Sequence, residues 1–312
     1  NCRCSLAYSV SDDDVAEARD LHTPESPLPN TSGQAPTGME DLEQDARAAA
    51  AGEGTREQLA GGAVGTSERV TLPNGRELFG KESASWFNRP AEEITDAEEL
   101  ASLLGQAINA PVPRVIRDGP RHIYTDWAEG KHGAEWFTDK WQGELDGPPD
   151  NEFLRSVVDS GPGKRLGLLD MLVQNGDRHT SNWLVTPEGV LTGIDHGNGW
   201  WFDEFTAPDE WLVEPVPPGE PAPFPQVVRG GLIGPFVRDR WVDQDQLEDN
   251  GLAVPVDTDV WTAGDVIETR RRLRLLRPDF LRLGHGDWLD YSLKVLDLLE
   301  SHATGTESIF DG

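Results

Sequence analysis

The sequence predicts an α+β fold of two lobes: a small mixed lobe of strands and one helix, then a mainly helical lobe, behind a disordered N-terminal tail. All 11 Trp and all 10 Phe residues come after residue 66. Only the later part of the chain therefore has enough large apolar side chains for a substantial core. Strand-like segments are frequent between residues 67 and 127, whereas helical patterns dominate afterwards.

The predicted tail covers residues 1–66. It is rich in Ser, Pro, Gly, Ala and acidic residues, and its only aromatic residue is Tyr8. Such a composition buries too little apolar area to offset the entropy of ordering the chain. Within the tail, Met39–Ala51 is a candidate short helix. Both cysteines, Cys2 and Cys4, lie in the tail, so no disulfide framework of the core is expected.

The first lobe is assigned to residues 67–127. An Asn-Gly turn at residues 74–75 predicts a hairpin of two short strands. A helix follows, with Thr95 as its predicted N-cap and Glu98, three residues later, as the acid of a capping box. Two further strands complete this lobe, Val115–Ile116 and His122–Tyr124.

The second lobe is assigned to residues 128–312. A second hairpin joins Trp183–Val185 to Val190–Ile194 through a Thr-Pro-Glu-Gly turn. Helices are expected at about residues 153–158, 165–173, 264–276 and 286–302.

The charge of the chain limits its partners. The formal net charge is −29, from 27 Lys and Arg residues against 56 Asp and Glu residues. Nucleic acids and anionic membranes bind clustered cations, so a general affinity for either is excluded. No apolar run reaches the ~18 residues that a membrane span needs, and no basic-then-apolar leader opens the sequence. We expect no nucleic-acid partner, no membrane insertion and a cytoplasmic location.

Three polar residues flank the second hairpin. Asn182 enters it and Asp195 leaves it, and a hairpin brings its two open ends together. Their side chains offer hard oxygen ligands, which Mg²⁺ prefers. Asp177 lies on the loop just before Asn182 and is placed to face the same point. An acid as base, an Asn and a second Asp around Mg²⁺ form the phosphoryl-transfer arrangement of kinases.

The motif D-R-H-x-x-N-x-L at residues 177–184, followed by I-D-H-G at residues 194–197, resembles the catalytic and metal-binding loops of the phosphatidylinositol 3-/4-kinase-like superfamily. That group includes HipA-type protein kinases and other small bacterial kinase-like proteins. The resemblance covers roughly residues 62–300 and implies a two-lobed protein-kinase-like fold. It also implies roles for individual residues: Asp177 as catalytic base, Asn182 and Asp195 as Mg²⁺ ligands, and His179 as a group that assists the transferring phosphoryl group. Arg178 is expected to order the loop by pairing with a carboxylate, for which Asp170 is the candidate.

The same resemblance implies a lysine that contacts the α- and β-phosphates of ATP. Lys81 is the only lysine before residue 131 and follows a predicted strand. Its partner is expected to be a helix glutamate, and we assign Glu99 because Glu98 is taken up as a capping residue. Glu92 and Glu93 are the alternatives.

The glycine-rich segment 61–67 precedes the first strand, where the superfamily places its phosphate loop. The backbone N–H groups of Gly65, Thr66 and Ser67 are the candidates to hold phosphate, and an ordinary linker is the alternative. The segment from Tyr124 to Trp127 is the predicted hinge whose backbone meets adenine.

The segment after Asp195 indicates the substrate class. It has no Lys or Arg before Arg229 and carries six acidic residues between 203 and 220. Such a segment repels a polyanionic phosphoinositide headgroup. We therefore expect an ATP- and Mg²⁺-dependent kinase that acts on a Ser or Thr hydroxyl of a peptide or protein. The alternatives are a nucleotide-binding pseudokinase or scaffold, and a kinase for a lipid or small-molecule alcohol.

Overall fold

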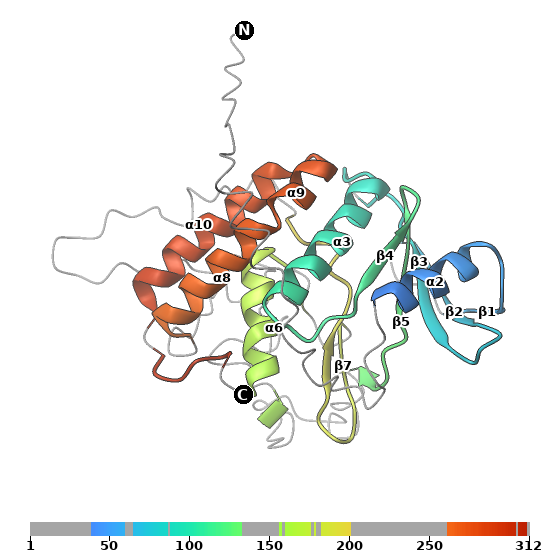
Figure 1. Cartoon of the computed structure of the whole chain (residues 1–312), viewed down its shortest axis with the longest axis horizontal. Coiled ribbons are helices and arrows are strands. Elements are labelled where there is room, and N and C mark those ends of the chain that lie inside the picture. Colours follow the sequence, from blue (N-terminus) through green and yellow to red (C-terminus); the bar gives the residue numbers. More distant parts are fainter. Residues whose placement is uncertain are drawn as a thin grey trace, which may run out of the picture. The chain divides into compact units, whose positions relative to one another are not determined.

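The computed structural model describes residues 39–59, 65–86, 88–132, 156–157, 160–175, 178, 182–200, 261–303 and 305–310. Its first lobe is a five-stranded antiparallel sheet in the order β1-β2-β3-β5-β4 (Figure 1). These strands are β1 Thr55–Gln58, β2 Thr66–Thr71, β3 Glu77–Glu82, β4 Val115–Asp118 and β5 His122–Asp126. The predicted Asn-Gly hairpin is confirmed as the turn between β2 and β3, where Gly75 has a φ of +83° and its N–H donates to Leu72 O over 2.9 Å.

The folded chain begins well before residue 66. Helix α2, Met39–Ala50, packs Leu42, Ala46 and Ala49 into one cluster with apolar residues of the sheet. These three positions recur at helical spacing, so small side chains suffice to dock the helix without any aromatic residue. The short helix predicted at residues 39–51 is thus confirmed. The tail boundary at residue 66 is wrong, because α2 and β1 both precede it; residues 1–38 lie outside the described residues.

Helix α3, Ala91–Ala107, begins earlier than the sequence predicted. Its first residue follows Pro90, which fits a helix start because proline lacks an N–H to be satisfied. Thr95 lies inside the helix, where its hydroxyl is 3.0 Å from Ala91 O and 2.9 Å from Ser83 Oγ. Thr95 is therefore not an N-cap, and the predicted capping box with Glu98 does not form.

The second lobe combines a small sheet with helices. Strands β6 Lys131–His132, β7 Trp183–Val185 and β8 Leu191–Gly193 pair in that order. The β7–β8 hairpin confirms the second predicted hairpin. The helices are α6 Gly161–Leu172, α8 Ala263–Leu275, α9 Arg277–Leu283 and α10 Gly286–His302. Most of the helix predicted at residues 153–158 lies outside the described residues.

Two apolar clusters make up the described core. One joins α2 to the first sheet. The other contains α6, β7, α8 and α10 together with the Leu100, Leu104 and Ile108 side chains of α3. Helix α3 contacts both β4 and the helices α6, α8 and α9 (Figure 1). The α+β fold of two lobes is therefore confirmed, and α3 shares its apolar core with the second lobe. No helix in the described ranges has the length and apolar composition that crossing a membrane requires.

Candidate active site

The β7–β8 hairpin brings its open ends together as predicted. Ile194 N–H donates to Asn182 O over 3.1 Å, which places Asp195 next to the start of the hairpin. Asp195 has a φ of +56°, a left-handed conformation that turns the chain sharply after β8. The Asp195 side chain is 44% exposed, whereas Asn182 is buried.

Lys81 links the two lobes at this point. It comes from β3, and its Nζ lies 2.6 Å from Glu98 Oε1 on α3 and 2.7 Å from Asp195 Oδ1. The other Glu98 oxygen, Oε2, accepts the His196 N–H over 3.0 Å. One carboxylate therefore fixes both the ammonium of Lys81 and the backbone that follows Asp195.

The partner of Lys81 is Glu98, and the assignment to Glu99 is wrong. Glu99 instead contacts Arg117 of β4 at 3.3 Å and Arg282 of α9 at 2.6 Å. Adjacent helix residues point about 100° apart, so the helix rotation decides which glutamate faces Lys81. The alternatives also fail, because Glu92 pairs with Arg121 and Glu93 with Arg89.

The pKa values of Lys81 and Asp195 shift in opposite directions because the two charged groups lie against each other. Burial alone would lower the pKa of Lys81, but the carboxylates of Glu98 and Asp195 outweigh it and hold that pKa above its usual value. The ammonium of Lys81 in turn lowers the pKa of Asp195 to about 2, against the opposing effect of burial. At neutral pH Lys81 is therefore protonated and Asp195 is ionised.

Arg178 and Asp170 form a second ionic cluster, which contacts the backbone at the two ends of the hairpin. Arg178 is completely buried and binds both carboxylate oxygens of Asp170, each over 2.9 Å. It also donates to the carbonyl oxygens of Asn182 and Ile194, the latter over 2.6 Å. The expected pairing with Asp170 is confirmed. Since its guanidinium is buried and bound to the hairpin backbone, Arg178 is a positioning residue and not one that touches substrate.

His196 belongs to the same buried cluster. Its Nε2 lies 2.8 Å from Arg178 Nη2. Burial, followed by the positive charge of Arg178, holds the pKa of His196 well below its usual value. The imidazole is therefore neutral at physiological pH, and Nε2 accepts from the guanidinium while Nδ1 carries the proton.

The three residues predicted to hold phosphate, Gly65, Thr66 and Ser67, lie at the beginning of strand β2. Thr66 and Ser67 belong to β2 and pair with Glu82 and Lys81 of β3. Gly65 comes just before them with a φ of +107°, and a Cβ there would lie 2.1 Å from Glu82 O. Only glycine fits this position. The loop between β1 and β2 thus ends at Gly65, and its residues 60–64 lie outside the described residues.

The two hinge candidates differ in their surroundings. Tyr124 lies inside the sheet, paired with Gly80 of β3 and Ile116 of β4, and its side chain packs in the α2 cluster. Tyr124 therefore lies between two neighbouring strands, and its role in the hinge stays a prediction. Trp127 follows the end of β5, where its N–H donates to Glu77 O over 3.3 Å. Trp127 also remains a candidate for the hinge.

Two predicted catalytic residues, Asp177 and His179, lie outside the described residues, so their roles stay predictions. Sequence reasoning missed Arg89, which is buried just before α3 and donates to Gly197 O over 2.8 Å. Its only sequence signal is a glutamate four residues later, Glu93, which it binds over 3.1 Å. Arg89 ties the start of α3 to the segment that follows Asp195.

The side chains at the hairpin fit a magnesium site. The Asp195 carboxylate is ionised and partly exposed, and Asn182, which carries an amide oxygen, is its neighbour at the open end of the hairpin. Carboxylate and amide oxygens are the donors that Mg²⁺ prefers. Lys81, bound to the same carboxylate, adds a fixed positive charge for phosphate.

The part of the chain that carries the two motifs is similar to a known kinase family. A family model described as phosphatidylinositol 3- and 4-kinase matches residues 135–229, which include both sequence motifs. The match falls on the part of the chain in which the two motifs resemble the phosphatidylinositol 3-/4-kinase-like superfamily. Among solved structures, the chain is similar to the maize SIRK1 (sucrose-induced receptor kinase 1) kinase domain bound to AMP-PNP, at 14% identity and a TM-score of 0.35, over 89% of this chain and 94% of that chain. At this level of similarity SIRK1 indicates nothing about the substrate of this chain.

Proposed function

We propose that this chain is an ATP- and Mg²⁺-dependent kinase of an atypical, protein-kinase-like kind, which transfers the γ-phosphoryl group to a Ser or Thr hydroxyl of a peptide or protein. The observation that carries the proposal is the Lys81 ammonium, 2.6 Å from Glu98 and 2.7 Å from Asp195. Kinases need such a lysine–glutamate pair and a metal-binding aspartate in place together.

The residues divide the work of phosphoryl transfer, which depends mainly on positioning and charge stabilisation. Glu98 holds Lys81 so that its ammonium meets the α- and β-phosphates. Asp195 and Asn182 would hold Mg²⁺, which supplies positive charge to the β- and γ-phosphate oxygens. Arg178 fixes the hairpin backbone beneath these two ligands. Asp177 is the proposed base for the acceptor hydroxyl, and His179 assists the phosphoryl group.

The proposed acceptor rests on charge. The segment between Asp195 and Arg229 contains no cation and six acidic residues. The negative charge of this segment attracts a cationic peptide, does not oppose a neutral one and repels a phosphoinositide headgroup. A protein or peptide hydroxyl is therefore favoured over a lipid one.

The test of the site is a calorimetric titration of ATP into the full chain with and without Mg²⁺. We expect Mg²⁺-dependent binding in the wild type and its loss in Asp195→Asn. Asp290→Asn serves as the control, because Asp290 is an exposed acid on α10 that pairs with Arg277. Binding that does not depend on Mg²⁺ would favour a pseudokinase, and no binding by a folded sample would refute the kinase proposal.

The acceptor needs a separate assay with radiolabelled ATP. Serine peptides with basic or acidic flanks, and vesicles containing phosphatidylinositol, are offered in parallel. We expect label in the basic-flanked peptide above the acidic-flanked one. Label in the lipid alone would replace the protein acceptor by a lipid acceptor.

A further inference from the structure

Helix α3 is attached to the two lobes in different ways. Its Leu100, Leu104 and Ile108 side chains belong to the apolar cluster of the second lobe. The first sheet has a separate apolar cluster, which it shares with α2. Apolar packing therefore fixes α3 to the second lobe, and charged and polar side chains provide the described hydrogen bonds between the sheet and α3.

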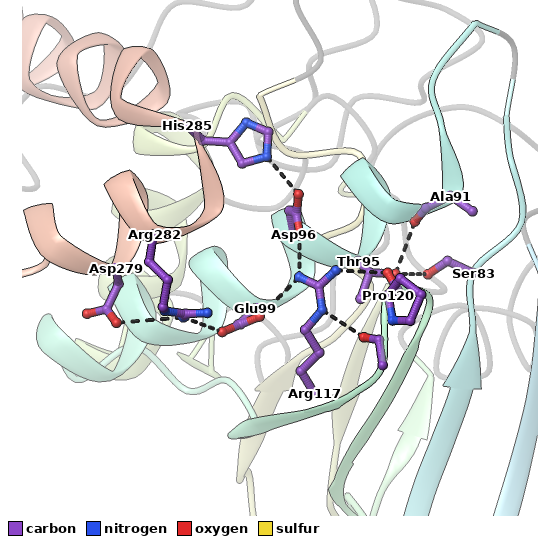
Figure 2. Close-up of polar contacts among 11 residues, drawn as sticks. Ser83, Ala91, Thr95, Asp96, Glu99, Arg117, Pro120, Asp279, Arg282 and His285 are labelled. Atoms are coloured by element: carbon purple, nitrogen blue, oxygen red, sulfur yellow. Dashed lines mark hydrogen bonds and ion pairs between the residues drawn. The ribbon is translucent and has the colours of Figure 1, made fainter.

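The largest of these polar links is Arg117 of β4 (Figure 2). Its Nη1 binds Asp96 and also lies 3.3 Å from Glu99 Oε2, so one guanidinium bridges two carboxylates of α3. Its Nε and Nη2 donate to the carbonyl oxygens of Gly119 and Pro120, each over 2.8 Å. The guanidinium is thus held by its own strand turn and has a fixed direction.

The same two carboxylates bind the second lobe with their other oxygens. Asp96 Oδ2 lies 2.7 Å from His285 Nε2, and Glu99 Oε1 lies 2.6 Å from Arg282 Nη2 (Figure 2). Residues three apart on a helix lie on one face. Asp96 and Glu99 therefore form one acidic face of α3 between two sources of cations, whereas Glu98 points to Lys81.

The sheet register connects this acidic face to the active site. Arg117 of β4 lies opposite Ile123 of β5, and Ile123 lies opposite Lys81 of β3. Residues directly opposite one another point to the same face of a sheet. Arg117 and Lys81 therefore lie in one row across the sheet, two strands or roughly 10 Å apart. Both form ion pairs with carboxylates of α3.

We propose that Arg117 is a positioning residue, which sets the angle of the sheet on α3 so that Lys81 meets Glu98 and Asp195. Any rocking of the sheet that separates Arg117 from Asp96 and Glu99 also shifts Lys81 in the same row. The expected loss of nucleotide affinity when Arg117 is replaced rests on the proposed kinase function. The expected increase in the mobility of the sheet does not depend on that function.

The loss of Arg117 leaves α3 itself in place. Asp96 keeps its contact with His285 and Glu99 keeps its contact with Arg282, so each carboxylate retains a partner in the second lobe. The apolar contacts of α3 with the second lobe also stay. Arg117→Gln therefore loosens the sheet on α3 without unfolding the helix.

The experiment compares Arg117→Gln with Arg121→Gln in the full chain. Arg121, between β4 and β5, also forms an ion pair with α3, through Glu92 at 3.2 Å. It serves as the control because both side chains of this pair are about half exposed. Hydrogen exchange is expected to accelerate in β3, β4 and β5 of Arg117→Gln and to stay unchanged in α3. We expect Mg²⁺-ATP affinity to fall about tenfold in Arg117→Gln and to be unchanged in Arg121→Gln.

Three outcomes overturn the proposal: unchanged exchange in the sheet, equal acceleration in α3 and the sheet, and the same pattern in Arg121→Gln. If Arg117→Gln does not fold, Arg117→Lys replaces it, and we expect the same pattern with a smaller amplitude because a lysine lacks the fork that spans both carboxylates. Hydrogen exchange needs no nucleotide. A wild type that binds no ATP would therefore refute the kinase function while the exchange data still decide the role of Arg117.

Discussion

The two ionic clusters beside the β7–β8 hairpin differ in how completely their charges are paired. In the Arg178 cluster, Arg178 and Asp170 are both fully buried and bind each other through two hydrogen bonds. In the cluster at the open end of the hairpin, the single ammonium of Lys81 contacts the carboxylates of Glu98 and Asp195. The Asp195 side chain is 44% exposed.

This difference separates a positioning role from a ligand-binding role. The Arg178 cluster balances one cation with one anion, and its other hydrogen bonds go to two backbone carbonyls and to His196 Nε2. It has no capacity for a ligand. The Lys81 cluster has two carboxylates for one ammonium, and the Asp195 carboxylate is accessible, which is the arrangement that accepts a divalent cation. Three predictions test this contrast, in order of decreasing effect.

The largest effect on stability is expected when the ion pair of the Arg178 cluster is broken. We expect Arg178→Met to lower the free energy of unfolding by about 3–5 kcal/mol, because Asp170 is left buried without its cation. Urea unfolding followed by tryptophan fluorescence measures this loss. A loss below about 1 kcal/mol, the size of an exposed ion pair, would show that the cluster is not closed to water.

Removing the Glu98 carboxylate from the Lys81 cluster is expected to affect activity more than stability. We expect Glu98→Gln to lower kcat/KM roughly 10- to 100-fold, because the amide carries no charge for Lys81 and has one acceptor oxygen where Lys81 and the His196 N–H need two. Glu99→Gln is the matched variant on the next residue of α3. Its effect is expected to be at most about threefold, since Arg117 keeps Asp96. Equal losses in the two variants would contradict the pairing of Lys81 with Glu98.

The smallest expected effect is the pH dependence of the Asp195 pairing. The pKa of Asp195 falls to about 2 beside Lys81, below its value of about 4 in an unfolded chain. Its stabilising contribution is therefore present above about pH 4 and is lost as the pH falls towards 2. Because the side chain is 44% exposed, solvent screening limits this contribution to about 1 kcal/mol or less.

The measurement compares the unfolding free energy of the wild type with that of Asp195→Asn at about pH 6 and about pH 3. The stability of the wild type relative to the variant is expected to decrease at the lower pH. A relative stability that increases on acidification would contradict the lowered pKa.

Local patterns in the sequence were enough to place the two hairpins, the body of α3 and the helices α6, α8 and α10. An Asn-Gly turn between strand-like segments and an apolar stripe at helical spacing act over a few residues, so they need no knowledge of the partner. The motif residues Asn182 and Asp195 were found for the same reason, since a hairpin itself brings its ends together.

Contacts between distant elements were decided by the tertiary structure alone. The choice of Glu98 over Glu99 depends on the rotation of α3, which begins four residues earlier than the apparent cap at Thr95. The folding of residues 39–58 depends on the face of the sheet that α2 covers, which its own composition does not reveal. Arg117 gains its position from a row across three strands. The sequence determined which chemical groups are present, and the packing of α3 against two lobes decided which of them meet, because side-chain pairing depends on rotations and registers that local patterns leave open.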